Sequence, residues 1–221
     1  MVWDILDNDD LGADKILTTG TMNALYDNPT AQAKREANTP SFVQVPVVEK
    51  LTAASGNWTW PDGVTAATFW IQAGGGGGGG GSGDGGDAAD STITYNSITT
   101  TAEGGFGGTR DGLAFTGGQG GNDGGGDFSV RGKSTVSING GSSFFGEGGA
   151  KSTISTPAIS PYQGGGGGGE GQGGGGGEMV RKRVVRVDGL NTVAYVNGAA
   201  GTAGSGGTQQ AGAAGFILVE Y

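Results

Sequence analysis

Alternating apolar and polar residues predict short β-strands near both ends of the region after residue 57. Residues 58–60 and 64–73 flank Pro61-Asp62-Gly63, a turn sequence in which proline presets φ and glycine accepts a positive φ. We therefore expect a β-hairpin. Strand side chains alternate between faces, which places both indoles of the first strand on one face and separates Phe69 from Trp70 in the second.

A second hairpin is predicted closer to the C-terminus. Residues 178–187 and 190–197 flank Asp188-Gly189, a strong two-residue turn signal. Residues 216–221 then read FILVEY, a short β-rich strand. We expect the N- and C-terminal strands of this region to share a small antiparallel sheet that caps the glycine-rich sequence between them.

Residues 1–40 have a different pattern and predict helix. Residues 18–26 begin with threonines suited to an N-cap, and Pro29 suits the first turn of a second short helix at 30–37. Both helices are weakly amphipathic, so 1–40 is expected to be an attachment or oligomerisation segment. Residues 41–57 are expected to be an extended connector.

The glycine content dominates residues 58–221, which we expect to form one glycine-rich domain. The chain has 53 glycines, with long runs at 74–81, 164–169 and 173–177. Two interpretations compete: flexible spacers, or extended polyproline II-type helices that pack side by side and hydrogen-bond to one another. Leu, Ile, Val and Phe make up about 18% of the chain, which excludes a large conventional core.

On energetic grounds, the glycine segments are expected to become ordered only if many of them pack together. Ordering one residue costs about 1–2 kcal/mol of backbone entropy, and a net hydrogen bond returns about 0.5–1.5 kcal/mol. The regular alternation of glycine runs with other inserts favours order. The expected fold class is therefore mostly irregular and β: a polyglycine II helix sandwich capped by a small antiparallel β-sheet, with a short α-helical N-terminal segment.

The inserts between the glycine runs carry most of the remaining aromatic residues. Aromatic side chains on exposed loops suit the recognition of saccharides or proteins, whereas buried ones simply fill a core. Both interpretations stay open for each residue. The candidate binding residues are Tyr95, Phe115, Phe128, Phe144, Phe145 and Tyr162.

Composition excludes several functions. The net charge is −9, and the one basic run at 181–183 is diluted by acidic surroundings, which argues against nucleic-acid binding. The chain has no cysteine and no histidine, so thiolate nucleophiles, Cys-type zinc sites and the commonest general base are missing. The N-terminus does not read as a secretory leader, and no apolar run reaches the length of a membrane span.

The motifs that suggest chemistry are weak. Matches to GxGxxG arise from glycine content alone, and a P-loop ending at 132–134 would need glycine where Asp127 stands. Asp84, Asp87 and Asp90 resemble calcium ligands, but their spacing does not fit the glycine-rich calcium repeat, and solvated loop acids are the simpler interpretation.

Two carboxylate pairs could be taken for glycosidase residues, namely Asp123 with Asp127 and Glu170 with Glu178. Nothing in the sequence places either pair across a cleft. We expect no enzyme activity, including polysaccharide depolymerisation, and we expect no cofactor and no metal.

The order of these features resembles the glycine-rich receptor-binding proteins found at the tail-fibre tips of tailed bacteriophages. Residues 60–77, WPDGVTAATFWIQAGGGG, look like the turn, strand and polyglycine start of that family. Residues 198–207, GAAGTAGSGG, followed by GFILVEY at 215–221, look like its ending. Residues 22–31, MNALYDNPTA, are similar to helical connectors of phage tail proteins.

The resemblance implies a polyglycine II sandwich whose variable loops, at one end, contact a host receptor: a surface glycan, a pilus or an outer-membrane protein. It also implies a place on the virion, attachment to other tail proteins through the N-terminal segment, and assembly as a homotrimer. The alternative is a purely structural or ice-binding polyglycine bundle. Small ice binders of that type tend to be stapled by disulfides, and this chain has no cysteine.

Overall fold

A computed structural model describes residues 46–110, 120–121, 125–135, 138–150, 161 and 163–221. This part of the chain contains nine β-strands and no α-helix. The expected fold class is therefore wrong: the described protein is all-β, with two antiparallel sheets rather than one small cap. The predicted helices of 1–40 lie outside the described residues.

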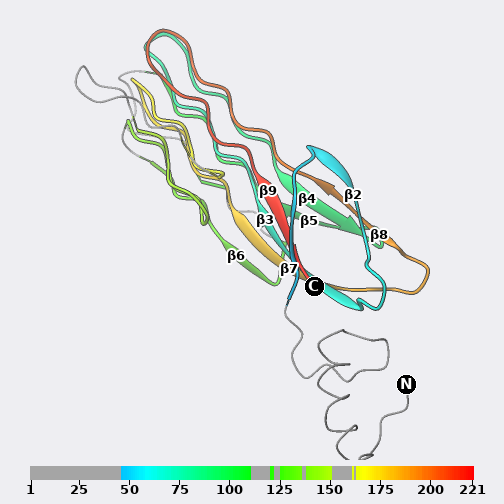
Figure 1. The fold of residues 1–221 in the computed structure, drawn as a ribbon. Helices are drawn as coiled ribbons and strands as arrows, with labels where there is room; N and C mark the ends of the chain where they lie inside the picture. Colours follow the sequence, from blue (N-terminus) through cyan, green and yellow to red (C-terminus); the bar gives the residue numbers. More distant parts are fainter. Residues whose placement is uncertain (1–45, 111–119, 122–124, 136–137, 151–160, 162) are drawn as a thin grey trace, which may run out of the picture. The chain divides into compact units, whose positions relative to one another are not determined.

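The strands divide into a five-stranded sheet A, in the order β1-β9-β3-β7-β6, and a four-stranded sheet B, in the order β2-β8-β4-β5 (Figure 1). Every pairing of neighbouring strands is antiparallel. The strands of sheet A are β1 Val48–Leu51, β3 Ala66–Gln72, β6 Phe128–Val130, β7 Met179–Val185 and β9 Phe216–Glu220. The strands of sheet B are β2 Ser55–Thr59, β4 Ser91–Tyr95, β5 Ile98–Ala102 and β8 Thr192–Val196.

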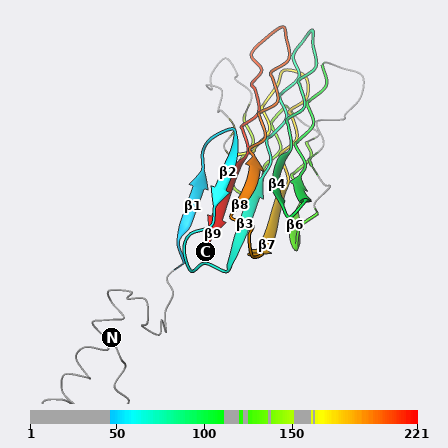
Figure 2. The ribbon, with the colours of Figure 1, turned by 90° about the vertical axis from the view of Figure 1, so that its right-hand side faces the viewer.

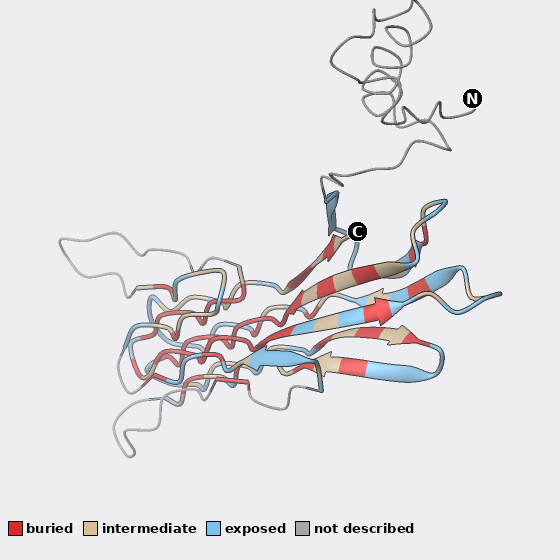
Figure 3. Ribbon diagram, turned by 90° about the horizontal axis from the view of Figure 1, so that it is seen from below, coloured by how far each residue is buried: buried red, intermediate tan, exposed pale blue. Residues whose placement is uncertain are grey.

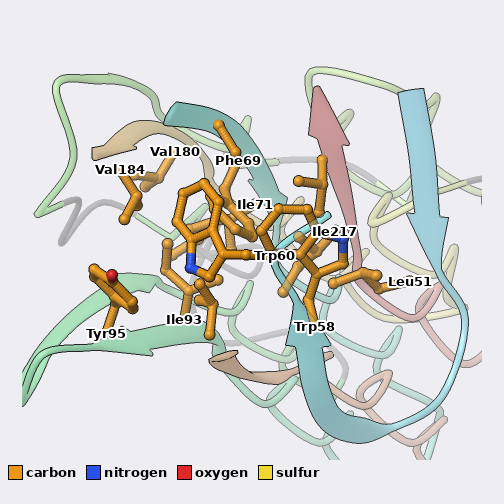
Figure 4. Close-up of a cluster of buried hydrophobic side chains, with 14 of the residues drawn as sticks. Leu51, Trp58, Trp60, Phe69, Ile71, Ile93, Tyr95, Val180, Val184 and Ile217 are labelled. Atoms are coloured by element: carbon orange, nitrogen blue, oxygen red, sulfur yellow. The ribbon is translucent and has the colours of Figure 1, made fainter. Parts of the chain in front are cut away.

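The hydrophobic core lies between the two sheets (Figure 4). Trp58 and Trp60 are both buried, with ring centroids 5.0 Å apart, as the alternation of side chains predicts. Trp58 also meets Phe69 of β3 edge to face, with centroids 5.5 Å apart. Phe69 is fully buried whereas Trp70 is partly exposed on the outer face of sheet A, so the predicted separation of these two residues is confirmed.

Neither predicted hairpin forms, because each turn carries the chain from one sheet to the other. Gly63 and Gly189 do adopt positive φ, at 77° and 82°, so the turns themselves are correct. However, β2 pairs with β8 and β3 pairs with β7 and β9. A hairpin would put the apolar faces of β2 and β3 side by side on one sheet and leave them uncovered. Crossing between the sheets lets the two faces bury each other.

The strands predicted at 64–73 and 216–221 do share a sheet, since β3 pairs with β9, but β1 lies within 41–57, which was expected to be an extended connector. Strand β1 pairs with β9 over its whole length. Beyond the strands, Val47 and Tyr221 exchange two backbone hydrogen bonds of 2.9 and 3.1 Å. The described body therefore begins and ends at the same corner of sheet A.

The glycine-rich segments leave the sheets together and form a second region, which we call the glycine bundle: residues 74–90, 103–109, 164–177 and 198–215. Gly74–Gly80 are all buried, so the first run is not a solvated linker. Figure 3 shows long buried stretches along the extended segments beyond the strands. Successive N–H groups of the first run donate to different neighbouring segments, and every third N–H donates to the same segment. The first cycle consists of Gly75 to Ala213, Gly76 to Gly175 and Gly77 to Gly86.

The carbonyl groups of the same run follow the same rule. Gly74, Gly75 and Gly76 accept hydrogen bonds of 2.8–2.9 Å from three further segments. The donors are Gly105, Gly201 and Gly167. A repeat of three residues is that of an extended chain with three residues per turn, which sends successive backbone groups outward in three directions. The run is therefore enclosed by six neighbouring segments and held only by backbone.

These contacts leave no room for side chains inside the bundle. A Cβ atom built on Gly77 would lie 1.8 Å from the carbonyl oxygen of Thr202, and one on Gly75 would lie 2.1 Å from that of Gly165. Both obstacles are backbone atoms, which have no rotamer to change. Close packing of this kind explains why the sequence requires uninterrupted glycine.

Two buried polar side chains, one from each sheet, join the sheets to the bundle. Gln72 donates from Nε2 to the carbonyl oxygens of Gly177 and Glu178, at 3.0 and 3.1 Å. Ser91 donates from Oγ to the Gln72 carbonyl at 2.9 Å and accepts from the Gly198 N–H at 2.8 Å. Each residue satisfies backbone groups where the ladder of strand hydrogen bonds ends and the three-residue pattern begins.

Replacing Gly77 by alanine should destabilise the protein by about 3 kcal/mol or more, since the methyl group would overlap the Thr202 backbone. Gly125→Ala is the matched control, because a Cβ at Gly125 meets nothing within 4 Å. Urea denaturation followed by tryptophan fluorescence measures both variants. Equal unfolding midpoints would contradict the close packing at Gly77.

Replacing Ser91 by alanine should cost about 1–3 kcal/mol, because it leaves the buried Gly198 N–H without its Oγ partner and removes a hydrogen bond to the Gln72 carbonyl. The exposed Ser82→Ala should change the unfolding free energy by less than about 0.5 kcal/mol. Thermal unfolding of the two variants gives the comparison, and a Ser91→Ala protein as stable as the wild type would rule out this role of the hydroxyl.

Candidate functional site

The glycine bundle separates the sheets from a group of turns at its far end, which we call the distal tip (Figure 2). The tip comprises turns 81–84, 170–172 and 205–209, together with Arg110. The Gly81 N–H donates to Gly206 at 2.9 Å and the Gly79 N–H to Gln172 at 2.8 Å, so the three turns are tied together. At about 3.1 Å per residue, the glycine run after β3 places the tip about 25 Å from the end of that strand.

The described side chains of the distal tip are polar. The hydroxyl oxygens of Ser82 and Ser205 lie 3.3 Å apart and are exposed. The exposed Glu170 carboxylate packs directly on Gly207, whose φ is 136°. Hydroxyl and carboxylate oxygens are suited to hydrogen-bonding hydroxyl or amide groups of a partner. None of the described tip residues is aromatic, so none of the predicted aromatic binding residues is among them.

Asp84, Asp87 and Asp90 form a row along an outer segment of the bundle. Their Oδ1 atoms accept hydrogen bonds from backbone N–H groups of the next segment, at 2.6, 2.7 and 2.9 Å. The donors are Arg110, Gly107 and Gly104, so the row follows the three-residue repeat of the bundle. These carboxylates accept hydrogen bonds from backbone N–H groups, which is a structural role. Their spacing of three residues could have indicated it. In the described residues no group of three or more potential metal ligands comes together.

The six predicted binding residues do not gather at one place. Tyr95 belongs to the core: it is 9% exposed, its ring lies 5.9 Å from that of Trp60, and its hydroxyl accepts from the Val187 N–H at 2.6 Å. Phe115 and Tyr162 lie outside the described residues.

The other three predicted residues lie beside sheet A. Phe128 of β6 is 52% exposed, and Phe144 is 50% exposed. Phe145 stacks edge to face between Phe144, at 4.9 Å, and Phe216 of β9, at 5.2 Å. The turn that carries Phe144 and Phe145 therefore covers one end of the outer face of sheet A.

A row of side chains crosses the rest of this outer face, one from each strand. The strand register aligns Lys50, Leu218, Trp70, Arg181 and Phe128 in that order. The Arg181 guanidinium lies 5.2 Å from the Trp70 ring centroid, and the indole N–H donates to Glu220 at 3.3 Å. We call these five residues the outer row. Trp70 was not among the predicted binding residues, although its place opposite Phe69 already indicated an outward side chain.

The structure describes three of the four carboxylates in the two predicted pairs, namely Glu170, Glu178 and Asp127. Glu170 is at the distal tip, whereas Glu178 is buried at the sheet end of segment 173–177, where its Oε2 accepts from the Glu103 N–H at 3.1 Å. The extended segment from residue 173 to Glu178 separates the two carboxylates by roughly 15–20 Å, well beyond the spacing of a glycosidase pair. Asp123 lies outside the described residues.

Asp127 fixes the start of β6 against β7. Its Oδ1 accepts from Lys182 Nζ at 2.7 Å, and its Oδ2 accepts from the Arg183 N–H at 2.7 Å. The Lys182 hydrogen bond, helped by the Arg183 N–H, lowers the pKa of the Asp127 carboxyl below its usual value. Because the folded protein favours the ionised carboxylate, this interaction stabilises the fold above the normal pKa of aspartate and loses its effect as pH falls through the lowered value.

Asp127→Asn should therefore lower the unfolding free energy at pH 6 by about 0.2–1 kcal/mol, the range of an exposed ion pair. The difference from the wild type should shrink once the pH drops below about 4. Urea denaturation at pH 6 and at pH 3 measures both effects, and Asp62→Asn in the turn after β2 serves as a control. A difference that persists unchanged at pH 3 would contradict the ionic origin.

Among the described residues there is no helix with the length and apolar character needed to cross a membrane. No protein-family model matches the chain, and no curated protein matches it.

Proposed function

We propose that this chain is a receptor-binding protein of a tailed-bacteriophage tail fibre, and that the distal tip contacts the bacterial surface. The observation that carries the proposal is the glycine bundle itself, an all-backbone body that holds polar turns of unrelated sequence about 25 Å from the sheets. Such a body fixes the positions of the turns without specifying their side chains.

The position of the sheets supports the same division. Val47 and Tyr221 are hydrogen-bonded neighbours at one corner of sheet A, so the described body joins the preceding residues 1–46 at the sheet end. In the proposal, the sheet end faces the virion and the tip faces the host. Attachment to other tail proteins through residues 1–40, and assembly as a homotrimer, belong to the proposal as well.

The receptor class follows from the chemistry of the tip. Exposed hydroxyl groups of Ser82, Ser205 and Thr208 and the Glu170 carboxylate favour a ligand rich in hydrogen-bonding groups. A surface glycan or the polar loops of a pilus or outer-membrane protein meet this requirement. Phe115, in the insert that follows Arg110, remains a predicted aromatic contact, and so do Phe128, Phe144, Phe145 and Tyr162.

The test is the binding of the fluorescently labelled protein to bacterial cells. Ser82→Arg and Thr208→Arg each place a long cation among the exposed residues of the tip, and together they should weaken cell binding about tenfold or more. Thr99→Arg, on the exposed face of sheet B, should bind as the wild type does. Exchanging turn 205–209 for one of another sequence should change which strains are bound.

Two results would contradict this proposal: labelled protein that binds no strain in a broad panel, or tip variants that bind cells as well as the Thr99→Arg control. Phe144→Ala, measured in the same assay, separates the predicted aromatic contact from the tip. If only Phe144→Ala weakens binding, the receptor contacts sheet A instead of the tip.

One observation favours the second candidate, an ice-binding surface. Small residues are exposed at every third position on two antiparallel neighbouring segments: Ala199, Thr202 and Ser205 on one, and Thr208, Ala211 and Ala214 on the other. Thermal hysteresis measured on the purified protein decides between the two candidates, because a receptor-binding protein has no reason to depress the freezing point. Thr202→Lys would remove the effect if this surface bound ice.

A further inference from the structure

Strand β7 is longer than the strand that covers its outer edge. On one side β3 pairs with all of β7, from Met179 to Val185. On the other side β6 pairs only with residues 179–181. Within the described chain, residues 182–185 therefore have no strand beside them on that edge, although Asp127 reaches the first part of it with its carboxylate.

The direction of the backbone groups can be read from their neighbours. The Arg183 N–H points to the open edge, where Asp127 Oδ2 accepts it at 2.7 Å, and the Arg186 N–H points the other way, to Thr65 of the β3 side, at 2.8 Å. In an antiparallel strand the N–H and C=O of one residue share a direction, and directions alternate. The Arg183 carbonyl and both backbone groups of Val185 therefore face the open edge, and no described group pairs with them.

An apolar groove of about 220 Å³ lies beside this edge, between β7 and the β4–β5 hairpin. The aliphatic residues that line it are Ile93, Ile98, Val184, Val185 and Val187. Ile98 is 66% exposed and Val185 is 57% exposed. An open edge with an adjoining apolar groove is the arrangement that accepts an added strand.

The charge at this edge selects the partner. Four of the 12 Lys and Arg residues of the chain fall within six positions: Arg181, Lys182, Arg183 and Arg186. The net charge of the chain is −9, so this cluster stands out against an acidic protein. Asp127 already shows how an acidic residue binds here, with one carboxylate shared between Lys182 Nζ and the Arg183 N–H.

We propose that the open edge of β7 binds an extended acidic peptide segment of a partner protein. The segment adds a strand to sheet A in line with β6, pairs with the free backbone groups of Arg183 and Val185, and places aliphatic side chains in the groove. Its acidic residues face the arginines. This site lies in the sandwich, apart from the distal tip, and does not depend on the proposed receptor function.

A second copy of the same chain is a poorer occupant of this edge. Two β7 edges paired antiparallel would bring the cation cluster of one copy against that of the other, and like charges on facing strands are destabilising. Light scattering on the protein alone distinguishes this case, since an oligomer that Val185→Pro disrupts would identify a second copy as the occupant and overturn the proposal.

The probe is a fluorescein-labelled, acetylated seven-residue peptide in which aspartate and valine alternate, titrated with the full-length protein and followed by fluorescence anisotropy. We expect saturable binding with a dissociation constant on the order of 0.1 mM. A peptide of the same sequence with N-methylated backbone amides should not bind, because it cannot pair with the strand. A peptide with lysine in place of aspartate should not bind either.

Two variants localise the site. Val185→Pro removes an N–H that faces the open edge, where proline is tolerated, and should weaken peptide binding about tenfold. Ile98→Asp puts a carboxylate at the groove and should repel the acidic peptide, whereas Val48→Asp, at the opposite edge of sheet A and 60% exposed, should have no effect. The proposal is overturned if the peptide does not saturate, if its N-methylated form binds equally well, or if Ile98→Asp binds it as Val48→Asp does.

Discussion

Close approach between backbones is the constraint on which this structure depends. In the glycine bundle each residue directs its N–H and C=O to different neighbouring segments, and the neighbours lie so near that a Cβ on Gly77 would stand 1.8 Å from a carbonyl oxygen. A single segment of this kind has no partners of its own, so it gains nothing from becoming ordered alone. The segments are stable only as a set, which requires the strands at their base to hold them in place.

The two sheets supply what the bundle lacks, a hydrophobic core. Trp58, Trp60 and Phe69 pack between the sheets, while Gln72 and Ser91 carry the hydrogen-bond network from β3 to Gly177 and Gly198 of the glycine bundle. The residues that form the hydrophobic core are thereby separated from the exposed turns of the distal tip. Apolar burial is concentrated at the sheet end, and the exposed hydroxyl groups of the distal tip lie outside that core.

This separation gives the molecule three chemically different surfaces. The distal tip offers hydroxyl and carboxylate groups, the outer row of sheet A offers Trp70 and Phe128 with Arg181 between them, and the open edge of β7 offers backbone groups beside a cationic cluster. The receptor hypothesis assigns the tip to the host, and the strand-addition hypothesis assigns the β7 edge to a partner protein. Because the distal tip and the β7 edge lie on different elements, variants of one of these two surfaces leave the other intact.

The sequence by itself determined the local features. Alternation separated Phe69 from Trp70, the turns at Gly63 and Gly189 form as predicted, and the predicted strands at 64–73 and 216–221 share a sheet. The tertiary structure alone decided which sheet each strand joins, because a turn sequence sets a local change of direction but not whether the next strand pairs or crosses. It also decided the fate of the aromatic residues: Tyr95 and Phe144 look alike in sequence, yet one is buried against Trp60 and the other is half exposed. Exposure depends on what packs from the opposite sheet, and that contact joins residues far apart in the chain.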